Sequence, residues 1–334
     1  MYSVSISSDG NYIVAGGGNK VYFFDSAEGY LWSYTVGRGL DIVTSVSISS
    51  DGSYIAATSS LSGVHLFDKN RNLLWKDDSL LFSNSVAMSS DGSYVVAGGD
   101  TTDWGGELRL YDRSGTILWS YQTTDGSFEL VDISSTGQYI VASCADEFGA
   151  WDVIYLFNKE NSVPLWSYEA GYRVGSVSIS LDGSTIVVGV GHETIGKVLV
   201  FDRTSNTPLW VYESDDSIDP VDVSSDGQYI VAGEFLGGNI YFFNKENNEP
   251  LWIYQTGYDG VTYSVQSVSI SSDGSYLAAG DEYSLYLFGK ENNQVLWEHR
   301  LGDDVNSVSI SAAGSSVVAG SSNGEIQFYF RGSQ

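Results

Sequence analysis

The chain has 334 residues, of which 42% are apolar and 14% aromatic, so it has enough apolar material for a packed core and is not expected to be disordered. Its 42 acidic and 15 basic residues give a formal net charge of −27, which repels phosphate backbones and anionic lipids and argues against nucleic-acid and membrane partners. The single cysteine, Cys144, excludes an intrachain disulfide, and no apolar stretch is long enough to span a membrane.

One repeated unit organises the sequence, and residues 45–67 show it most clearly: S-V-S-I-S-S-D-G-S-Y-I-A-A-T-S-S-L-S-G-V-H-L-F. The glycine of its turn recurs eight times at spacings of 40 to 47 residues, a period typical of repeat architectures. These glycines are Gly10, Gly52, Gly92, Gly137, Gly183, Gly227, Gly274 and Gly314. We therefore expect residues 1–334 to form a single domain of eight repeats. The first repeat follows Met1 directly and leaves no room there for a signal peptide.

Each unit is expected to form four short strands, as the first unit illustrates. Residues Ser3–Ser7 alternate serine with valine or isoleucine, which is the period-2 pattern of a strand. After the turn at Gly10 come Tyr12–Gly16, Val21–Asp25 and Leu31–Tyr34, separated by turns rich in glycine and asparagine. Four antiparallel strands in such a period are typical of a propeller blade, so we predict an all-β, eight-bladed β-propeller.

The side chains of the unit suit a wedge-shaped sheet. Serine in the first strand lets the inner strands approach an axis closely, whereas Val46, Ile48 and their counterparts are expected to lie between neighbouring blades. Farther out, the third-strand aromatic residues and the tryptophan of an L-W pair fill the wider gap. These tryptophans are Trp32, Trp75, Trp119, Trp166, Trp210, Trp252 and Trp297.

The first three strands of the unit occur in eight copies, but the L-W strand occurs in seven, which predicts 31 strands. The last blade, at residues 307–330, is therefore expected to lack its outer strand. Either a further L-W-x-Y strand precedes Met1 in the natural polypeptide, or the eighth blade has three strands.

The S-x-D-G turn, the third strand that ends in Phe-Asp and the L-W strand resemble WD-type and PQQ-like (quinoprotein-like) propeller repeats over essentially the whole chain. An L-W pair placed seven or eight residues after Asp25, Asp68 or Asp202 is similar to the tryptophan-docking repeat of eight-bladed quinoproteins. Two departures are an irregular glycine before the tryptophan and the lack of a W-D dipeptide at the end of the third strand. The resemblance implies a fold; it does not imply one function, because propellers serve many.

The loops of the repeat fall into a monotonous and a variable set. The turns between the first and second strands and between the third and fourth barely vary, and they share one end of the blades, the plain face. The other end, the variable face, carries loops of differing length and chemistry, the longest being Gly99–Glu107, Cys144–Val153, Gly189–Lys197 and Gly257–Val265. A scaffold with one variable face usually binds its ligand there.

Aromatic side chains interleaved with carboxylates on the variable face are the candidate binding residues, because such surfaces suit sugars or cationic side chains. The candidates are Asp103, Trp104, Glu107, Asp146, Glu147, Phe148, Trp151, His192, Glu193, Phe235, Tyr258 and Tyr283. The alternative interpretation is that these rings fold onto the variable face and anchor its loops.

The sequence offers no catalytic constellation. One cysteine excludes the paired cysteines of quinoprotein dehydrogenases, no H-E-x-x-H occurs, and His192 is the one histidine placed in a variable loop. We expect no cofactor. Calcium is the ion that suits the oxygen-rich segments Asp100–Glu107 and Asp215–Asp219 best, although neither has the EF-hand spacing.

These observations predict a non-enzymatic recognition or scaffold module that binds a protein or a glycan through an acidic, aromatic-containing variable face. The alternative is a ligand-sensing or catalytic domain of a larger protein with a loop-held calcium ion. By resemblance of composition, poor in lysine and rich in serine, tyrosine and glycine, the chain is expected to be extracellular or on the cell surface.

Overall fold

The computed structural model describes residues 1–101, 105–124, 126–145, 151–192 and 194–332. These residues form 31 strands and no helix, so this part of the chain offers no helix that could cross a membrane. The chain divides into two compact units, residues 1–171 and 172–334, each with four antiparallel sheets. We number the sheets 1 to 8 in chain order. A single domain over residues 1–334 stays a prediction.

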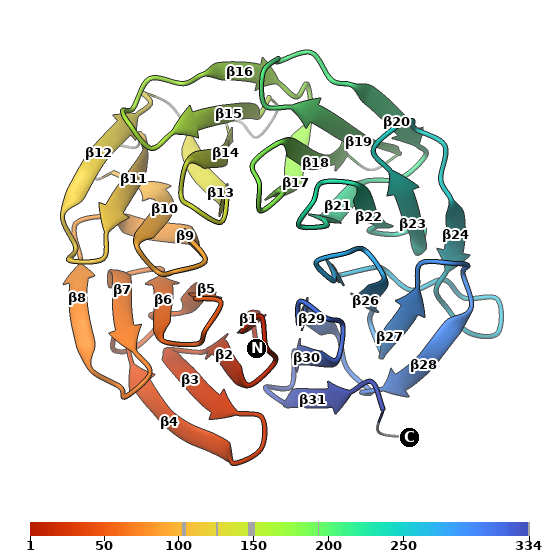
Figure 1. The fold of residues 1–334 in the computed structure, drawn as a ribbon, viewed down its shortest axis with the longest axis horizontal. Helices are drawn as coiled ribbons and strands as arrows, with labels where there is room; N and C mark the ends of the chain where they lie inside the picture. The colour runs from red at the N-terminus through yellow and green to blue at the C-terminus, as the bar shows by residue number, and fades with distance from the viewer. Residues whose placement is uncertain (102–104, 125, 146–150, 193, 333–334) are drawn as a thin grey trace. The chain divides into compact units, whose positions relative to one another are not determined.

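The first unit contains sheets 1 to 4, and in each sheet every strand pairs with its neighbour in the sequence (Figure 1). Its strands are β1 (Ser3–Ile6), β2 (Tyr12–Gly17), β3 (Lys20–Asp25), β4 (Gly29–Thr35), β5 (Val43–Ile48), β6 (Tyr54–Ser59), β7 (Gly63–Asp68), β8 (Leu73–Asp77), β9 (Leu81–Met88), β10 (Tyr94–Asp100), β11 (Gly106–Asp112), β12 (Ile117–Gln122), β13 (Ser127–Ile133), β14 (Tyr139–Ala145), β15 (Val153–Asn158) and β16 (Trp166–Glu169).

The second unit contains sheets 5 to 8 with the same strand order, and sheet 8 has three strands. Its strands are β17 (Arg173–Ile179), β18 (Thr185–His192), β19 (Ile195–Asp202), β20 (Trp210–Ser214), β21 (Ile218–Val223), β22 (Tyr229–Glu234), β23 (Asn239–Asn244), β24 (Trp252–Gln255), β25 (Ser267–Ile270), β26 (Tyr276–Gly280), β27 (Ser284–Gly289), β28 (Val295–Arg300), β29 (Val305–Ile310), β30 (Ser316–Ser321) and β31 (Ile326–Phe330). Both the predicted number of strands and the three-stranded last sheet are confirmed for the described residues.

Apolar side chains of the first strands lie between neighbouring sheets, as predicted. Val46 and Ile48 of sheet 2 are buried in one cluster with Phe23 and Trp32 of sheet 1. Val268 of sheet 7 occupies the equivalent cluster against sheet 6. Burial of each such side chain stabilises the fold by roughly 1.5–3 kcal/mol, so the interfaces between sheets form the core of each unit.

Serines of the first strands also accept hydrogen bonds from the neighbouring sheet. The Oγ atom of Ser3 accepts a hydrogen bond from the backbone N–H of Val46 in the next sheet at 3.2 Å. Ser267 accepts one from Val308 in the same way at 3.0 Å. From the sequence we predicted that these small residues let the inner strands approach closely. The hydrogen bond, which satisfies a backbone N–H donor where two sheets meet, was not predicted.

The S-S-D-G turn caps one sheet and contacts its neighbour, as sheet 2 shows. Burial alone would raise the pKa of Asp51, but hydrogen bonds from Ser53 N–H (2.9 Å) and Ser49 Oγ (2.8 Å) outweigh it and hold that pKa below its ordinary value. Gly52 has a φ of 70°, which disfavours side chains. A Cβ there would lie 2.3 Å from Cδ2 of Tyr12 in sheet 1. Both the conformation and the close contact therefore require glycine.

Backbone hydrogen bonds also join the turns of successive sheets. The N–H of Ser50 donates to the carbonyl oxygen of Ser90 at 2.8 Å, and the N–H of Ser90 donates to that of Ser135 at 2.9 Å. In the second unit, Ser225 donates to Ser272 at 3.0 Å. The turns of sheets 2, 3 and 6 are thus each held by the turn of the following sheet.

The tryptophan of the fourth strand docks onto the next sheet. Trp32 stacks on Phe23 with ring centroids 5.1 Å apart, and its indole N–H donates to the carbonyl oxygen of Lys69 at 2.9 Å. The same bond, at 2.8 to 3.1 Å, joins Trp75 to Arg113, Trp119 to Lys159, Trp210 to Lys245 and Trp252 to Lys290. The predicted outer wedge is confirmed, and it includes a directional bond that fixes the position of the next sheet.

Replacement of a docked tryptophan should destabilise the protein. Trp119 is 8% exposed, so Trp119→Ala removes a buried ring and its hydrogen bond and should lower the free energy of unfolding in urea by about 3–5 kcal/mol. Trp151 is 60% exposed, and Trp151→Ala, the matched control, should change it by less than about 0.5 kcal/mol. Equal losses for the two variants would contradict the docking role of Trp119.

The turn carboxylate should make stability depend on pH. Because the folded-state pKa of Asp51 lies below the ordinary value of 3.8, its stabilisation is fully present above that value and is lost as the pH falls through the folded-state pKa. Asp51→Asn should therefore be less stable than the native protein at pH 7, and the difference should shrink below pH 3.8. A difference that stays constant with pH would show that the charge of Asp51 contributes nothing.

Candidate recognition surface

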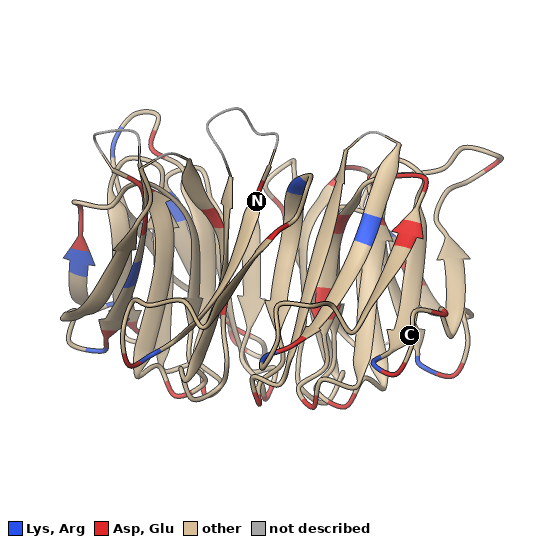
Figure 2. Ribbon diagram, turned by 90° about the horizontal axis from the view of Figure 1, so that it is seen from above, with Lys and Arg blue, Asp and Glu red and all other residues tan. Residues whose placement is uncertain are grey.

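The antiparallel order of each sheet fixes which loops share an end. The loops between second and third strands, together with the links between sheets, lie at the variable face, and the other turns lie at the plain face. Figure 2 shows acidic residues at both ends of the strands. Acidic charge alone therefore does not mark a recognition surface, and the other side chains at the variable face have to be considered.

The predicted binding residues divide into three groups. Outside the described residues lie Asp103, Trp104, Asp146, Glu147, Phe148 and Glu193. Exposed at the variable face are Trp151, His192, Phe235, Tyr258 and Tyr283. The third group is Glu107 alone, which is only 4% exposed and belongs to the interior.

Glu107 takes part in a buried ion-pair network between sheets 2 and 3. Its Oε2 atom lies 2.7 Å from Nη2 of Arg109, and Nη1 of Arg109 lies 2.7 Å from Oδ2 of Asp77. The hydroxyl of Tyr111 donates to the same Asp77 oxygen at 2.9 Å. Burial raises the pKa of Tyr111, and the negative charge of Asp77 reinforces the effect, so the hydroxyl stays protonated and donates. Glu107 therefore has a structural role in this network.

Comparison with the other sheets shows what this network replaces. The positions of Asp77 and Arg109 carry a pair of tyrosines at three other interfaces, with ring centroids 5.0 to 5.7 Å apart: Tyr121–Tyr155, Tyr212–Tyr241 and Tyr254–Tyr286. Sequence reasoning missed this paired exchange. The signal was present, because both tyrosines change to residues of opposite charge in consecutive units.

Buried carboxylates without ion pairs occupy the variable face of sheet 6. Glu234 is 4% exposed and accepts hydrogen bonds from Tyr241 OH at 2.5 Å, Asn239 Nδ2 at 2.7 Å and Ser214 Oγ. Burial raises the pKa of nearby Asp216, and the negative charge of Glu234 adds to that increase. Neutral donors thus hold Glu234 in place at the end of β22.

Aromatic residues gather on the loops of sheets 6 and 7. Tyr263 and Tyr283 pack edge to face with centroids 4.7 Å apart. Tyr258 and Val261 form a two-residue bridge at the tip of a hairpin, and the Arg300 guanidinium lies 4.7 Å from the centre of the Tyr258 ring. We use the name loop surface for the exposed apolar residues here: Phe235, Leu236, Tyr258, Val261 and Tyr283.

Two cavities at the variable face occupy equivalent positions in the repeat. One, of about 410 Å³, lies between sheets 3 and 4 beside Tyr121 and Tyr155. The other, of about 440 Å³, lies between sheets 5 and 6 beside Tyr212 and Tyr241. The second cavity is lined by Glu213, Asp215, Asp216 and Glu234. The first is lined by Cys144, whose pKa is raised by burial and by the negative charges of Asp152, Asp100 and Glu129.

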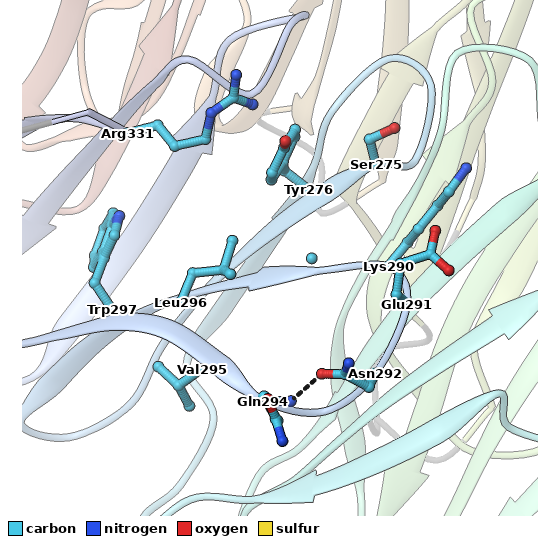
Figure 3. Close-up of a pocket in the computed structure, with 11 residues that line it drawn as sticks. Ser275, Tyr276, Lys290, Glu291, Asn292, Gln294, Val295, Leu296, Trp297 and Arg331 are labelled. Carbon is cyan, nitrogen blue, oxygen red and sulfur yellow. Dashed lines mark hydrogen bonds between the residues drawn. The ribbon is translucent and has the colours of Figure 1, made fainter.

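A larger cavity, of about 640 Å³, lies at the plain face between sheets 7 and 8. Figure 3 shows Trp297, Tyr276 and Arg331 around it. A cavity of about 540 Å³ between sheets 2 and 3 is lined by the equivalent Trp75 and Arg113. The larger cavity is therefore a copy of a crevice that the repeat forms beside a fourth-strand tryptophan, and its size does not mark a specialised site.

Burial shields His65 and Cys144 from solvent. His65 is buried against Phe67 with stacked rings, and burial lowers its pKa to about 4. Burial raises the pKa of the Cys144 thiol to about 11, so this thiol is protonated at neutral pH and a poor nucleophile. His192, the histidine that the sequence singled out, lies exposed at the end of β18, and its neighbour Glu193 lies outside the described residues.

The two segments suggested for calcium have different surroundings. In Asp100–Glu107, residues 102–104 lie outside the described part, and Glu107 is bonded to Arg109. In Asp215–Asp219, Asp219 accepts a hydrogen bond from Ser217 Oγ at 3.1 Å. Among the described residues, no three or more of His, Cys, Asp and Glu lie close enough together to hold a metal ion.

Seven four-stranded meanders and one of three strands, five of them with a tryptophan docked onto the next sheet in the described residues, define the class of β-propeller proteins. The structure titled "Structure of Dos1 propeller" has a TM-score of 0.75 to this chain at 12% identity, over 100% of this chain and 92% of that one. At that identity the likeness shows the fold alone. The predicted all-β, eight-bladed propeller is confirmed, with each sheet forming one blade.

A family model described as "Outer membrane protein assembly factor BamB", of PQQ-like repeats, matches residues 150–334. The match covers more than half of the chain, so the chain belongs to this family of propeller-repeat proteins. A second model, "WD domain, G-beta repeat", matches residues 1–25. No curated protein matches the chain. The resemblance to WD-type and PQQ-like repeats predicted from the S-x-D-G turn and the L-W strand is confirmed.

Removal of Arg109 should test the buried network. Arg109→Met leaves the buried Glu107 and the half-buried Asp77 without a counter-charge, and such losses lower the free energy of unfolding by about 3–5 kcal/mol. The triple variant Asp77→Tyr, Arg109→Tyr and Glu107→Val copies the residues of the interface between sheets 3 and 4. It should recover most of that loss, because apolar packing can replace a buried ion pair. An Arg109→Met variant as stable as the native protein would contradict this account.

Proposed function

We propose that this protein is a non-enzymatic recognition module that binds a basic protein surface through the loop surface of sheets 6 and 7. The observation that carries the proposal is the exposure of several large apolar side chains on adjoining loops. Tyr258, Leu236 and Val261 are 64%, 59% and 59% exposed. Isolated apolar residues on a surface are ordinary, but a group of them on neighbouring loops is typical of an interaction site.

Carboxylates around the loop surface favour a basic partner. Asp259 and Glu282 belong to the same loops, Asp303 lies in the link between β28 and β29, and the whole chain carries a formal charge of −27. Acidic surfaces attract basic partners over long distances and speed their association, and exposed tyrosines add cation–π contacts with lysine or arginine. The partner class that fits is therefore a protein with lysine or arginine beside apolar residues.

Family membership supports a role in protein contacts. The description of the matching family model names an assembly factor for outer membrane proteins, and assembly depends on contacts between proteins. The extracellular or cell-surface location expected from composition is part of the same proposal, and no cofactor is. The alternative of a sensing or catalytic domain with bound calcium has no support from contacts among the described residues.

A photo-crosslinker at the loop surface should test the proposal. We expect p-benzoylphenylalanine at position 258 to give discrete protein adducts in an extract of the source organism. The adducts should decrease in 1 M salt, where screening shortens the range of charge interactions to about 3 Å. The matched control is position 30, because Tyr30 is 58% exposed but lies at the plain face. Equal adducts at both positions, or none at position 258, would overturn the proposal.

A further inference from the structure

The outer edge of sheet 8 differs from that of the other sheets in the second unit. Sheet 8 has three strands, whereas sheets 5 to 7 each have four. Its last strand, β31, pairs with β30 over the register from Gly320↔Ile326 to Ser316↔Phe330. No strand of the described residues pairs with the other edge of β31. We call this edge of β31 the open edge.

A backbone hydrogen bond shows which groups of β31 face the open edge. The N–H of Arg331 donates to the carbonyl oxygen of Ser315, beside β30, at 2.9 Å. Successive residues of a strand direct their backbone groups to opposite sides, so the odd-numbered residues of β31 face β30. The N–H and C=O groups of Ile326 and Phe328 therefore face the open edge, where a further strand could pair with them.

The side chains on one face of β31 are incompletely covered. Ile326 and Phe328 are half-buried, and Phe330 is 46% exposed. The residues that hold the position of Phe328 in sheets 5 to 7 are all fully buried: Val200, Phe242 and Leu287. Sheet 8 thus exposes apolar side chains at a position that the complete sheets bury.

The sequence of β31 also lacks the features that protect an exposed strand edge. Its residues, I-Q-F-Y-F, include no charged residue and no proline, and these are the residues that normally prevent an edge from pairing with other chains. The outer strands of sheets 5 and 7 do carry charge, with Glu213 in β20 and Glu298 and Arg300 in β28. The composition of β31 is therefore typical of a strand with neighbours on both sides.

The register of the complete sheets indicates which residue should lie opposite Phe328. In all seven of them, the residue at this position pairs with the tryptophan of the fourth strand. Phe23 stacks with Trp32 at 5.1 Å between ring centroids. Phe242 stacks with Trp252 at 5.2 Å. The phenylalanine at position 328 therefore matches a strand that brings a tryptophan.

The next two positions extend this pattern. Two residues after the tryptophan, Tyr254 pairs with Ile240, which is the counterpart of Ile326. The following residue of a fourth strand would lie opposite Glu325, which is exposed. Lysine or arginine there would meet the carboxylate, and the chain's net charge of −27 also attracts a basic partner.

We propose that the open edge binds an extended segment of a partner protein with the sequence L-W-x-Y followed by lysine or arginine. The seven L-W strands of this chain are already paired in sheets 1 to 7, so none of them is available to sheet 8. The segment pairs antiparallel with β31 as a fourth strand, and its tryptophan stacks on Phe328. This site does not depend on the loop surface, because it uses other residues.

A fluorescein-labelled peptide, G-L-W-S-Y-K-G, tests the proposal by fluorescence anisotropy with the purified protein. Its L-W-S-Y segment is copied from residues 31–34. We expect saturable binding with a Kd of about 100 µM or lower. The peptide G-L-A-S-Y-K-G, without the stacking ring, should bind at least about tenfold more weakly.

N-methylated peptides distinguish strand pairing from other modes of binding. The amide of the peptide tyrosine faces Ile326, so its N-methylation should weaken binding at least about tenfold. The amide of the peptide serine faces away from β31, and its N-methylation should be tolerated. These two peptides have the same composition, and each serves as the control for the other.

Protein variants locate the peptide. Phe328→Ala should weaken binding by about tenfold through loss of the ring beneath the tryptophan. The matched control is Tyr30→Ala, which removes a 58% exposed ring from β4 of a complete sheet and should leave binding unchanged. Glu325→Lys should weaken binding of G-L-W-S-Y-K-G and favour G-L-W-S-Y-E-G instead. Glu325 is exposed, so this charge reversal tests the site even if Phe328→Ala does not fold.

Residue-resolved hydrogen exchange shows whether the edge is open before the peptide is added. The amides of Ile326 and Phe328 should exchange fast in the protein alone, and the peptide should slow their exchange. The amides of Gln327 and Tyr329 face β30 and should be protected in both samples, which makes them the internal control.

Three outcomes would overturn the proposal. The first is no saturable binding of G-L-W-S-Y-K-G up to about 1 mM. The second is equal binding of the two N-methylated peptides, which would exclude strand pairing. The third is protection of Ile326 and Phe328 without peptide, which would assign the edge to a second copy if the protein sediments as a dimer and to the same polypeptide if it sediments as a monomer. The crosslinking result at position 258 is independent of these measurements, so failure of one proposal does not imply failure of the other.

Discussion

The contact between the indole of one sheet and a backbone carbonyl of the next is the interaction on which the rest of each unit depends. Trp32 stacks within its own sheet and donates to Lys69 in the next. The indole is held by stacking in its own sheet, and its hydrogen bond to the next sheet is directional. The tryptophan therefore sets both the distance between neighbouring sheets and their position along the strands. With the plain face held in this way, the loops at the other end are free to differ.

Much of this arrangement can be predicted from the sequence, because it depends on residues that recur in every unit. Val46, Trp32 and Gly52 each belong to a recurring pattern, and the pattern predicts whether the residue lies between sheets, at an outer edge or in a turn. The Asp77–Arg109 ion pair could not be predicted in the same way, because it depends on which strands of two neighbouring sheets face each other. The hydrogen bond accepted by Ser3 was missed for the same reason. The sequence gives the size of the serine side chain, but it does not show that the donor lies 43 residues away.

The candidate sites show how chemistry is placed on a constant framework. The tyrosines beside the two cavities are alike, and Cys144 lines one cavity at the position where Glu234 lines the other. Of the residues chosen from sequence, Trp151, Tyr258, Phe235 and Tyr283 are exposed at the variable face, whereas Glu107 serves the interior. The exposure of a side chain could not be predicted from its residue type, because an acidic residue can lie either in a buried ion pair or in solvent.

Within each unit, hydrogen bonds between successive turns, such as Ser50 to Ser90 and Ser90 to Ser135, join one sheet to the next. Links of this kind make stability approximately a sum of nearest-neighbour contributions. A gene that encodes such a chain can gain or lose a whole unit by duplication or deletion, because the new neighbours present the same donors and acceptors to each other. Because the turns of the plain face are similar from unit to unit, such a protein can change its length in evolution while each sheet keeps its own loops.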